Sequence, residues 1–412
     1  MPFSSLKLST QIKKALAKSN FIKPTPIQEK VIPYIIEGND IMAKAKTGSG
    51  KSASYILPIL EMLQKRRGEG KAKIKVLVLT PTRELTLQIA KTFEIFSQFQ
   101  EKRASVVSLI GGEGIGDQLY EIQQGCDVLV ATSGRFLDVL SKKQMNLSHL
   151  EFLVLDEADK MLNLGFAGEL DLILDAIPDK RQNLLFSATY PDKILDIASK
   201  ITKNPLEVSI EEDVPTVDTI SQRVIEVNIN NRASLLRHLI KTLKLKNVLV
   251  FMANKRATDN IAFKFRKYGF TAESFYGDLN QEDRTYTLNE FKDKKINILF
   301  ATDIAARGLD IDNIECVVNY DLPRSPTDYI HRIGRTARAG KIGLAISFIS
   351  HEDQAHFKVI EKKCKVKIKR EQIEGFEVTG ETPKKEKGPA PVKGKGKSKK
   401  DKLREKALKE SK

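Results

Sequence analysis

The residues of this chain best suited to chemistry lie between Ala45 and Ser52. They read Ala-Lys-Thr-Gly-Ser-Gly-Lys-Ser, after a short apolar run at 40–43 and before a helix-compatible segment at 53–62. The glycines allow backbone N–H groups to turn toward phosphate oxygens, Lys51 can reach the β- and γ-phosphates, and the Ser52 hydroxyl can ligate Mg²⁺. The segment therefore predicts a phosphate-binding loop. Because Ala45 replaces the usual first glycine, these residues alone are also compatible with an ordinary glycine-rich turn.

A second candidate is the acidic tetrapeptide 156–159, Asp-Glu-Ala-Asp, which directly follows the apolar run 152–155. In doubly wound parallel sheets, ligands bind beyond the carboxyl ends of the strands, which is where this tetrapeptide falls. Asp156 could hold Mg²⁺ through water, and Glu157 could orient and deprotonate an attacking water molecule. Without the phosphate loop, the same acids could instead mark the N-terminus of a helix.

Phe21 and Gln28 flank a pair of prolines near the N-terminus. Pro24 and Pro26 fix an extended approach to a helix start. The Gln28 amide offers both a donor and an acceptor to the edge of an adenine, and Phe21 offers a ring for stacking. By itself the segment indicates a loop followed by a helix start rather than an adenine site.

Three arginines at a spacing of three, Arg332, Arg335 and Arg338, occur near the end of the second half of the chain. On a helix this spacing would form a single cationic ridge. The ridge could supply a charge-neutralising arginine to a phosphate held by the first half. The alternative is a solvated helix face.

The elements that must position these residues alternate between strand-like and helical patterns. In the first half, strand-like runs lie at 75–80, 104–110, 127–131, 152–155, a run ending at 186, and 206–210, with helical patterns at 84–99 and 191–201. In the second half, strand-like runs lie at 224–227, 248–251, 272–276 and 296–301, with helical patterns at 232–244, 255–268 and 282–291. This alternation predicts two α/β domains with mainly parallel, doubly wound sheets. The second domain has no phosphate loop.

The length of 412 residues fits two domains plus an appendage. Lys and Arg exceed Asp and Glu by 69 − 53 = 16, which favours a polyanionic partner such as nucleic acid. Residues 384–412 hold twelve Lys and one Arg against four acids, a net charge of 13 − 4 = +9. This tail is rich in Pro and Gly, so we expect it to be disordered. Solubility is the alternative role for its charge.

The three cysteines are far apart and lack the paired spacing of a zinc site or a disulfide framework. The chain contains no apolar run of membrane-spanning length and no signal-peptide pattern. We therefore expect a cytoplasmic protein with no membrane association.

Taken together, the motifs resemble those of the DEAD-box ATP-dependent RNA helicases over about residues 3–368. The resemblance rests on their order along the chain: the segment with Gln28, the phosphate loop, Pro81-Thr82-Arg83-Glu84-Leu85, Gly111-Gly112, Thr132-Ser133-Gly134-Arg135, the Asp-Glu-Ala-Asp box, Ser187-Ala188-Thr189, Gln281-x-x-Arg284, Ala306-Arg307-Gly308-Leu309-Asp310 and His331-Arg332-Ile333-Gly334-Arg335. The opening Phe3-Ser4-Ser5-Leu6 and the short basic tail further resemble the bacterial RhlE type.

The resemblance implies a role for each matching position in an ATP site. Phe21 and Gln28 would bind adenine, and Asp310 would reach the ribose when the two domains close. The catalytic residues would be Lys51, Asp156, Glu157, Arg335 and Arg338, with Mg²⁺ held by Ser52 and Asp156. The remaining phosphate contacts would come from Thr47, Gly48, Ser49, Gly50, Lys51 and Ser52.

The resemblance also implies an RNA-binding surface and a set of residues that couple it to the ATP site. The residues that would contact RNA suit phosphates and 2′-hydroxyls, so little sequence specificity is expected. The RNA contacts would be Thr82, Arg83, Gly111, Gly112, Thr132, Gly134, Arg135, Gln281, Arg284 and Thr302. The coupling residues would be Ser187, Thr189 and His331.

The implied architecture is two RecA-like doubly wound parallel-sheet domains in tandem. We expect an N-terminal domain at 1–210, a linker at 211–218, a C-terminal domain at 219–368 and a basic, mostly disordered tail at 369–412. The implied activity is local unwinding of short RNA duplexes or remodelling of RNA–protein complexes, driven by Mg-ATP hydrolysis. We expect a monomer, with ribosomal or RNA-degradation complexes as candidate partners.

Two other classes of protein use similar residues. A translocating helicase or DNA-acting motor shares the two-domain ATPase, although the Gln28 segment and the Asp-Glu-Ala-Asp box favour local RNA strand separation. An ATP-gated RNA clamp would use the same residues as an unwinder, and the sequence does not separate the two.

Overall fold

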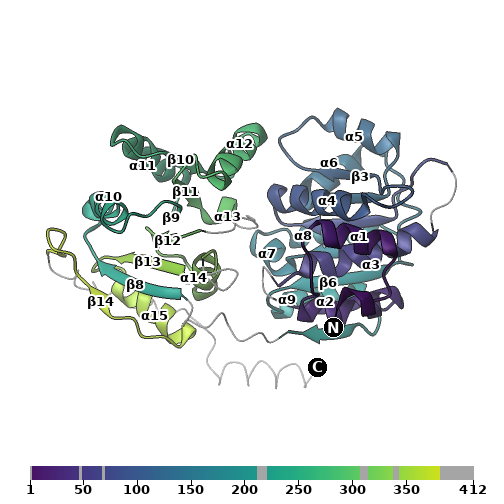
Figure 1. Ribbon diagram of the computed structural model, residues 1–412, viewed down its shortest axis with the longest axis horizontal. Helices are drawn as coiled ribbons and strands as arrows, with labels where there is room; N and C mark the ends of the chain where they lie inside the picture. Colours follow the sequence, from purple (N-terminus) through teal and green to yellow (C-terminus); the bar gives the residue numbers. More distant parts are fainter. Residues whose placement is uncertain are drawn as a thin grey trace, which may run out of the picture.

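The computed structural model describes residues 2–45, 49–66, 70–210, 220–306, 314–336 and 343–380. They form two seven-stranded sheets, each with helices on both faces, side by side in Figure 1. The strand orders are β3-β4-β2-β5-β6-β1-β7 and β10-β11-β9-β12-β13-β8-β14. All strand pairings found in the described ranges are parallel. The predicted fold class is confirmed.

The first sheet and its helices extend from the N-terminus to Ser209. The strands are β1 (Ile41–Lys44), β2 (Val76–Thr80), β3 (Val106–Leu109), β4 (Val128–Thr132), β5 (Phe152–Asp156), β6 (Gln182–Ser187) and β7 (Leu206–Ser209). The helices are η1 (Phe3–Ser5), α1 (Thr10–Lys18), α2 (Pro26–Ile36), α3 (Lys51–Arg66), α4 (Arg83–Ser97), α5 (Ile115–Gln124), α6 (Ser133–Ser141), α7 (Ala158–Asn163), α8 (Ala167–Ala176) and α9 (Asp192–Ile201).

The second sheet begins at Ile220. Its strands are β8 (Ile220–Glu226), β9 (Val248–Met252), β10 (Ala272–Phe275), β11 (Ile298–Thr302), β12 (Cys316–Asn319), β13 (Gly343–Ile349) and β14 (Arg370–Glu371). The helices are η3 (Ile229–Asn231), α10 (Arg232–Thr242), α11 (Lys255–Lys267), α12 (Gln281–Lys292), α13 (Asp303–Ala306), α14 (Pro326–Ile333) and α15 (Gln354–Cys364).

The central strands are continuous apolar runs because both faces of each sheet are covered by helices. In β2, Val76 and Val78 point into one hydrophobic cluster, whereas Leu77 and Leu79 point into the cluster on the opposite face. Strand β9 divides its residues between two clusters in the same way. A strand with one solvated face would instead alternate apolar and polar residues.

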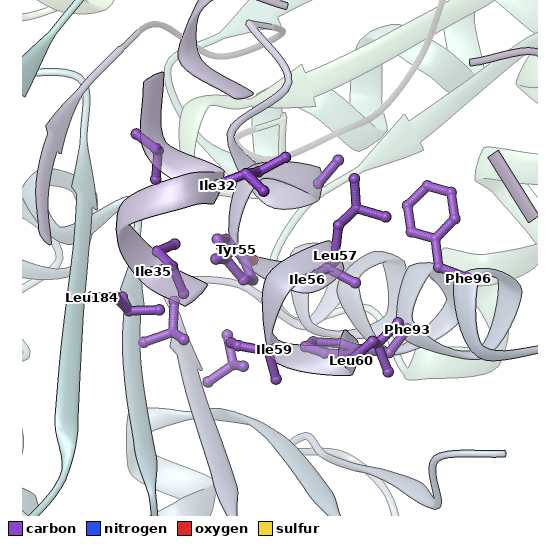
Figure 2. Close-up of a cluster of buried hydrophobic side chains, with 14 of the residues drawn as sticks. Ile32, Ile35, Tyr55, Ile56, Leu57, Ile59, Leu60, Phe93, Phe96 and Leu184 are labelled. Carbon is purple, nitrogen blue, oxygen red and sulfur yellow. The ribbon is translucent and has the colours of Figure 1, made fainter. Parts of the chain in front are cut away.

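Helix α3, which follows the predicted phosphate loop, is embedded in the core of the first domain. Figure 2 shows consecutive residues of this helix packed between α2, α4 and strand β6. The labelled side chains are Tyr55, Ile56, Leu57, Ile59 and Leu60 of α3, with Ile32, Ile35, Phe93, Phe96 and Leu184 around them. The loop is therefore anchored on a rigid helix.

The second sheet continues past the predicted domain limit at Ile368. Strand β14 pairs with β8, and Glu371 accepts hydrogen bonds from Arg223, the shortest of them 2.6 Å. Ile373 and Phe376 then pack against the core of this domain. The predicted linker at 211–218 and the tail beyond Gly380 lie outside the described residues. Among the helices that the structure describes, none is long and apolar enough to cross a membrane.

Candidate functional site

The predicted phosphate loop begins directly after β1 and finishes in the first turn of α3. The Lys51 side chain is buried, and its Nζ donates a hydrogen bond of 2.7 Å to the carbonyl oxygen of Ala45. Gly50 has a φ of +89°, and a Cβ there would lie 2.5 Å from Nε2 of Gln28. Only glycine fits this position, for reasons of both conformation and space. Thr47 and Gly48, two of the predicted phosphate contacts, lie outside the described residues.

Gln28 joins the N-terminal segment to this loop. Its Oε1 accepts a hydrogen bond of 3.0 Å from the backbone N of Thr25, and its Nε2 donates one of 3.1 Å to the carbonyl oxygen of Gly50. The first bond belongs to a capping box that starts α2. Phe21 lies with its ring edge-on to Phe96, with 5.4 Å between the centroids, and remains partly exposed. Gln28 therefore contacts both the start of α2 and the phosphate loop, whereas Phe21 packs on α4.

Asp156 is the last residue of β5 and is completely buried beside α3. Its Oδ2 accepts a hydrogen bond of 2.9 Å from the Tyr55 hydroxyl and a longer one of 3.4 Å from Ser52 Oγ. Its Oδ1 is buried and has no hydrogen-bond partner in the part of the chain that the structure describes. Burial raises the pKa of Asp156, and the charge of Lys51 opposes that rise. Burial likewise raises the pKa of Tyr55, so this phenol stays protonated and is the donor.

These oxygens fit Mg²⁺, which prefers hard oxygen ligands and usually binds one or two carboxylates together with water and substrate phosphates. The free Oδ1 of Asp156 and the adjacent Ser52 hydroxyl would be the protein's contribution to such a site. The described ranges contain no group of three or more His, Cys, Asp or Glu residues that could hold a metal by themselves. A metal at Asp156 would therefore rely on the nucleotide for its remaining ligands.

Glu157 follows β5 in a left-handed conformation, with a φ of 55° that is uncommon outside glycine. Its Oε1 accepts a hydrogen bond of 2.6 Å from Nζ of Lys160, and both side chains are almost fully buried. Burial would raise the pKa of Glu157, but the charges of Lys160 and Lys51 outweigh it and lower the pKa to about 2. Glu157 is therefore a carboxylate held by a buried lysine.

Asp159 connects the acidic box to the predicted coupling residues. Its Oδ2 accepts hydrogen bonds from the backbone N and the hydroxyl of Thr189, at 3.0 and 2.9 Å. Ser187 Oγ accepts a hydrogen bond of 3.2 Å from the backbone N of Asp159 and donates one of 2.7 Å to the carbonyl oxygen of Thr189. Any shift of the end of β6 relative to α7 would disturb the three bonds that involve Asp159.

Residues of the second domain reach the same acidic box. His331, on α14, has its pKa lowered by burial and then by the charge of Lys160, while Asp159 acts in the opposite direction. Arg335 is buried, and its charge contributes to lowering the pKa of both Glu157 and Lys160. A charge from the second domain therefore acts on Glu157. Asp310 and Arg338, predicted to bind ribose and phosphate, lie outside the described residues.

The prediction that the arginines form a single helical ridge is wrong for Arg332 and Arg335. Helix α14 ends at Ile333 with Gly334 as its C-cap, so Arg335 lies beyond the helix. Arg332 is buried and donates hydrogen bonds of 2.6 and 2.7 Å to the two carboxylate oxygens of Asp303. Arg332 is therefore a structural arginine of the second domain, whereas Arg335 lies beyond the end of the helix.

Arg83, Gly111, Gly112 and Arg135 gather at the edge of the first domain. The Arg83 guanidinium lies against the Gly-Gly turn, where a Cβ on Gly112 would be 2.8 Å from Nη1 of Arg83. Arg135 donates a hydrogen bond of 2.9 Å to the carbonyl oxygen of Glu113. Burial lowers the pKa of Arg83, and the charges of Arg284 and Arg135 lower it further. Like charges held this close favour an anionic ligand such as phosphate.

Arg284 forms a buried ion pair between the two domains. Its Nε lies 2.5 Å from Oε1 of Glu84 on α4, and its Nη1 donates a hydrogen bond of 2.6 Å to the carbonyl oxygen of Tyr276. Both charged side chains are at most 9% exposed. Arg284 was expected to contact RNA, and in this arrangement its guanidinium is occupied by protein groups. Glu84 itself was part of a recognised motif but had no predicted role.

The remaining predicted RNA contacts lie at strand ends or along the boundary between the domains. Thr82 caps α4 by accepting a hydrogen bond from the backbone N of Leu85, and Gln281 is buried at the start of α12. A cleft of about 970 Å³ is lined by residues of both domains, including Gly112 and Gln281. A neighbouring groove of about 600 Å³ includes Phe21, Glu84 and Gln281. Thr132 and Thr302 end β4 and β11, and Gly134 lies in the first turn of α6.

Sequence reasoning missed Tyr55 and Lys160. Tyr55 lies in an apolar helical pattern that indicates core packing, and only its hydroxyl could have signalled a polar neighbour. Lys160 follows Glu157 by three residues, the spacing at which opposite charges pair on a helix. That spacing was available as a signal.

Comparisons with known proteins agree with this geometry. The DEAD/DEAH box helicase model matches residues 25–197, and the helicase conserved C-terminal domain model matches residues 231–340. The chain is 37% identical to the ATP-dependent RNA helicase CshA of Listeria monocytogenes over 89% of its own length and 69% of that protein. For the DEAD-box ATP-dependent RNA helicase CshA of Geobacillus kaustophilus, the identity is 38%, covering 89% and 78%.

Solved structures give the same result. Mss116p bound to single-stranded RNA and AMP-PNP superposes with a TM-score of 0.82 at 30% identity, covering 91% of this chain and 80% of that one. Saccharomyces cerevisiae Dbp5 bound to RNA and ADP BeF3 superposes with a TM-score of 0.78 at 28% identity, covering 90% and 95%. The chain therefore belongs to the DEAD-box family of ATP-dependent RNA helicases.

Proposed function

We propose that this protein hydrolyses Mg-ATP at the boundary between its two domains and uses domain closure to separate short RNA duplexes or remodel RNA–protein complexes. The observation that carries the proposal is the boundary between the domains, where Arg284 pairs with Glu84 and charges from both domains act on Glu157. The carboxylate of this residue is influenced by Lys51 of the phosphate loop and by Arg335 of the second domain. If charged groups of both domains act on the water-activating residue, hydrolysis would depend on closure.

We assign a part in this reaction to each residue of the ATP site. Lys51 and Ser52 would bind the phosphates, and Asp156 with Ser52 would hold Mg²⁺, which supplies charge neutralisation at the β- and γ-phosphates. Glu157 would orient the attacking water and accept its proton, and Arg335 would stabilise the charge of the transferred phosphoryl group. We assign Arg338 the same role as Arg335, and Asp310 a contact with the ribose.

RNA would lie along the boundary between the domains, against the arginines and glycines at the edge of the first sheet. Arg83, Arg135 and the turn at 111–112 offer cations and backbone groups to phosphates. We infer binding through the sugar-phosphate backbone with little sequence preference. The relatives bound to RNA and nucleotide analogues support this partner by likeness.

The finer assignments are part of the proposal. We propose domains at 1–210 and from 219 onward, joined by a linker at 211–218, and a monomer that works with ribosomal or RNA-degradation complexes. We also propose the RhlE type, because the opening Phe3-Ser4-Ser5-Leu6 and the short basic tail resemble it. Crosslinking the protein to RNA in cells and sequencing the bound fragments would identify the substrate.

The proposed function is tested by measuring Mg²⁺-dependent ATP hydrolysis with single-stranded RNA, with single-stranded DNA of the same sequence, and without nucleic acid. We expect stimulation by RNA alone, together with displacement of one strand from a short RNA duplex. Equal stimulation by DNA would favour a DNA-acting motor. Stimulated hydrolysis without strand displacement would favour an ATP-gated clamp.

A further inference from the structure

Tyr55 is a polar residue at the centre of an apolar core. Figure 2 shows its ring on α3 among the aliphatic side chains of Ile32, Ile35 and Ile59. The side chain is fully buried, and its ring packs against Phe186 with 5.1 Å between the centroids. A phenylalanine would fill the same space, so apolar packing does not explain the hydroxyl.

The hydroxyl reaches Asp156 at the end of β5. It donates a hydrogen bond of 2.9 Å to Oδ2, the same oxygen that Ser52 contacts at 3.4 Å. Ser52 and Tyr55 are three residues apart, so they lie on one face of α3. Both hydroxyls therefore converge on one oxygen of the carboxylate, and the other oxygen, Oδ1, has no hydrogen-bond partner within the described residues.

We propose that Tyr55 is a positioning residue for Mg²⁺: its hydroxyl fixes Oδ2 of Asp156, so that Oδ1 is presented to the metal or to a water molecule in the metal's shell. This inference rests on the function proposed above, because it assumes that Asp156 serves a metal bound with the nucleotide. Tyr55 itself touches neither metal nor nucleotide in the proposal.

The physical reason is preorganisation. A carboxylate that can rotate loses orientational freedom when it binds a metal, and a second hydrogen bond to the carboxylate removes that freedom beforehand. The Tyr55 ring is held on all sides by the core of the first domain, so its hydroxyl is a fixed point. The exposed end of a flexible side chain would not serve as well.

The test is Tyr55→Phe in the full chain, with binding of a fluorescent ATP analogue measured across a Mg²⁺ titration and in EDTA. We expect unchanged affinity in EDTA and a Mg²⁺ requirement raised about tenfold, the lower end of the effect usual for groups that orient metal ligands. The matched control is Tyr329→Phe, which also removes a buried phenol that donates a hydrogen bond, here 2.8 Å to Gln222 in the second domain. This control should leave the Mg²⁺ requirement as in the parent.

A second pair of variants tests whether Tyr55 acts through Asp156. In an Asp156→Asn background, Tyr55→Phe should produce no further change in the Mg²⁺ requirement, because the oxygen that it positions has lost its charge. An equal change in both backgrounds would overturn the proposal. So would a lowered unfolding temperature of Tyr55→Phe with a parental Mg²⁺ requirement, since the hydroxyl would then be structural.

The metal role of Asp156 and the positioning role of Tyr55 can be disproved separately. If the parent binds nucleotide equally well with and without Mg²⁺, the proposed metal role of Asp156 fails, and the inference about Tyr55 fails with it. If the parent depends on Mg²⁺ and Tyr55→Phe depends on it equally, only the inference about Tyr55 fails.

Discussion

The two domains have the same strand topology but use the same position of the sheet differently. Counted from the first strand of each domain, both sheets have the order 3-4-2-5-6-1-7. The fifth strand is β5 in the first domain and β12 in the second. An acidic residue lies at or just beyond the carboxyl end of each: Asp156 ends β5, and Asp321 follows β12 by two residues.

The surroundings of these two acids differ. Asp321 pairs with Arg232 at 3.1 Å and accepts a hydrogen bond of 2.8 Å from the backbone N of Ala253, and Arg232 also pairs with Asp353 at 2.6 Å. Asp156 lies in a fully buried position and keeps Oδ1 without a hydrogen bond from the described residues. The acid at this sheet position is therefore paired with protein groups in the second domain, whereas in the first domain it keeps an oxygen for the ligand that we propose.

The largest expected effect is on the water-activating group, which the first domain supplies. Glu157→Gln should lower ATP turnover by at least about a hundredfold, because the attacking water loses its base. Nucleotide and RNA affinity should stay near those of the parent, since Asp156 still serves the metal. Turnover kinetics together with binding of a fluorescent ATP analogue measure both; parental turnover would remove Glu157 from the mechanism.

The second prediction concerns the ion pairs of the second domain. Arg232→Met should lower the free energy of unfolding of that domain by about 3 kcal/mol, because two carboxylates lose their common partner at a buried site. Calorimetry of the full chain resolves this transition. The control is Arg223→Met, whose pair with Glu371 is more exposed and should contribute at most about 1 kcal/mol. Equal losses in the two variants would contradict the distinction.

The third prediction concerns the pair that joins the domains. Glu84→Gln should weaken RNA binding in the presence of a non-hydrolysable ATP analogue by about tenfold, equivalent to about 1.4 kcal/mol, because Arg284 stays buried without its carboxylate. Glu94→Gln, on the same helix and in an exposed pair with Lys91, should change nothing. RNA affinity is measured by fluorescence anisotropy. An unaffected Glu84→Gln protein would show that the pair does not stabilise the RNA-bound arrangement.

The smallest expected effect has opposite signs in the two domains. The pKa of Asp156 is raised by burial, so its ionised form opposes folding at neutral pH. Asp156→Asn should therefore raise the unfolding temperature of the first domain by about 2–4 °C, the shift that 1 kcal/mol produces in a domain of this size. Asp321→Asn should lower the unfolding temperature of the second domain, because Arg232 loses a partner. Two shifts of the same sign would remove the contrast.

The architecture could be predicted from sequence because buried parallel strands are continuous apolar runs. The runs at 75–80 and 152–155 correspond to β2 and β5. The helical position predicted for Arg335 from its spacing was wrong. A spacing of three residues places side chains on one face only while the helix continues, and α14 ends before Gly334.

The candidate site could be predicted only where motifs are local in the chain. The segment from Ala45 to Ser52 and the box at 156–159 are each made of consecutive residues. Their proposed chemistry can therefore be inferred from sequence alone. The contact between Glu84 and Arg284 joins residues 200 positions apart, and no pattern within either motif specifies it. Tyr55 was hidden for another reason: its hydroxyl is a single polar atom in a helix whose pattern indicates core packing.

We propose above all that nucleotide bound in the first domain and RNA bound along the domain boundary are coupled through closure. The most direct measurement is RNA affinity with and without a saturating non-hydrolysable ATP analogue, in Mg²⁺. Coupled sites should give RNA binding at least about tenfold tighter with the analogue, and the analogue should bind more tightly to the RNA complex by the same factor. Equal RNA affinity in the two conditions would contradict the claim.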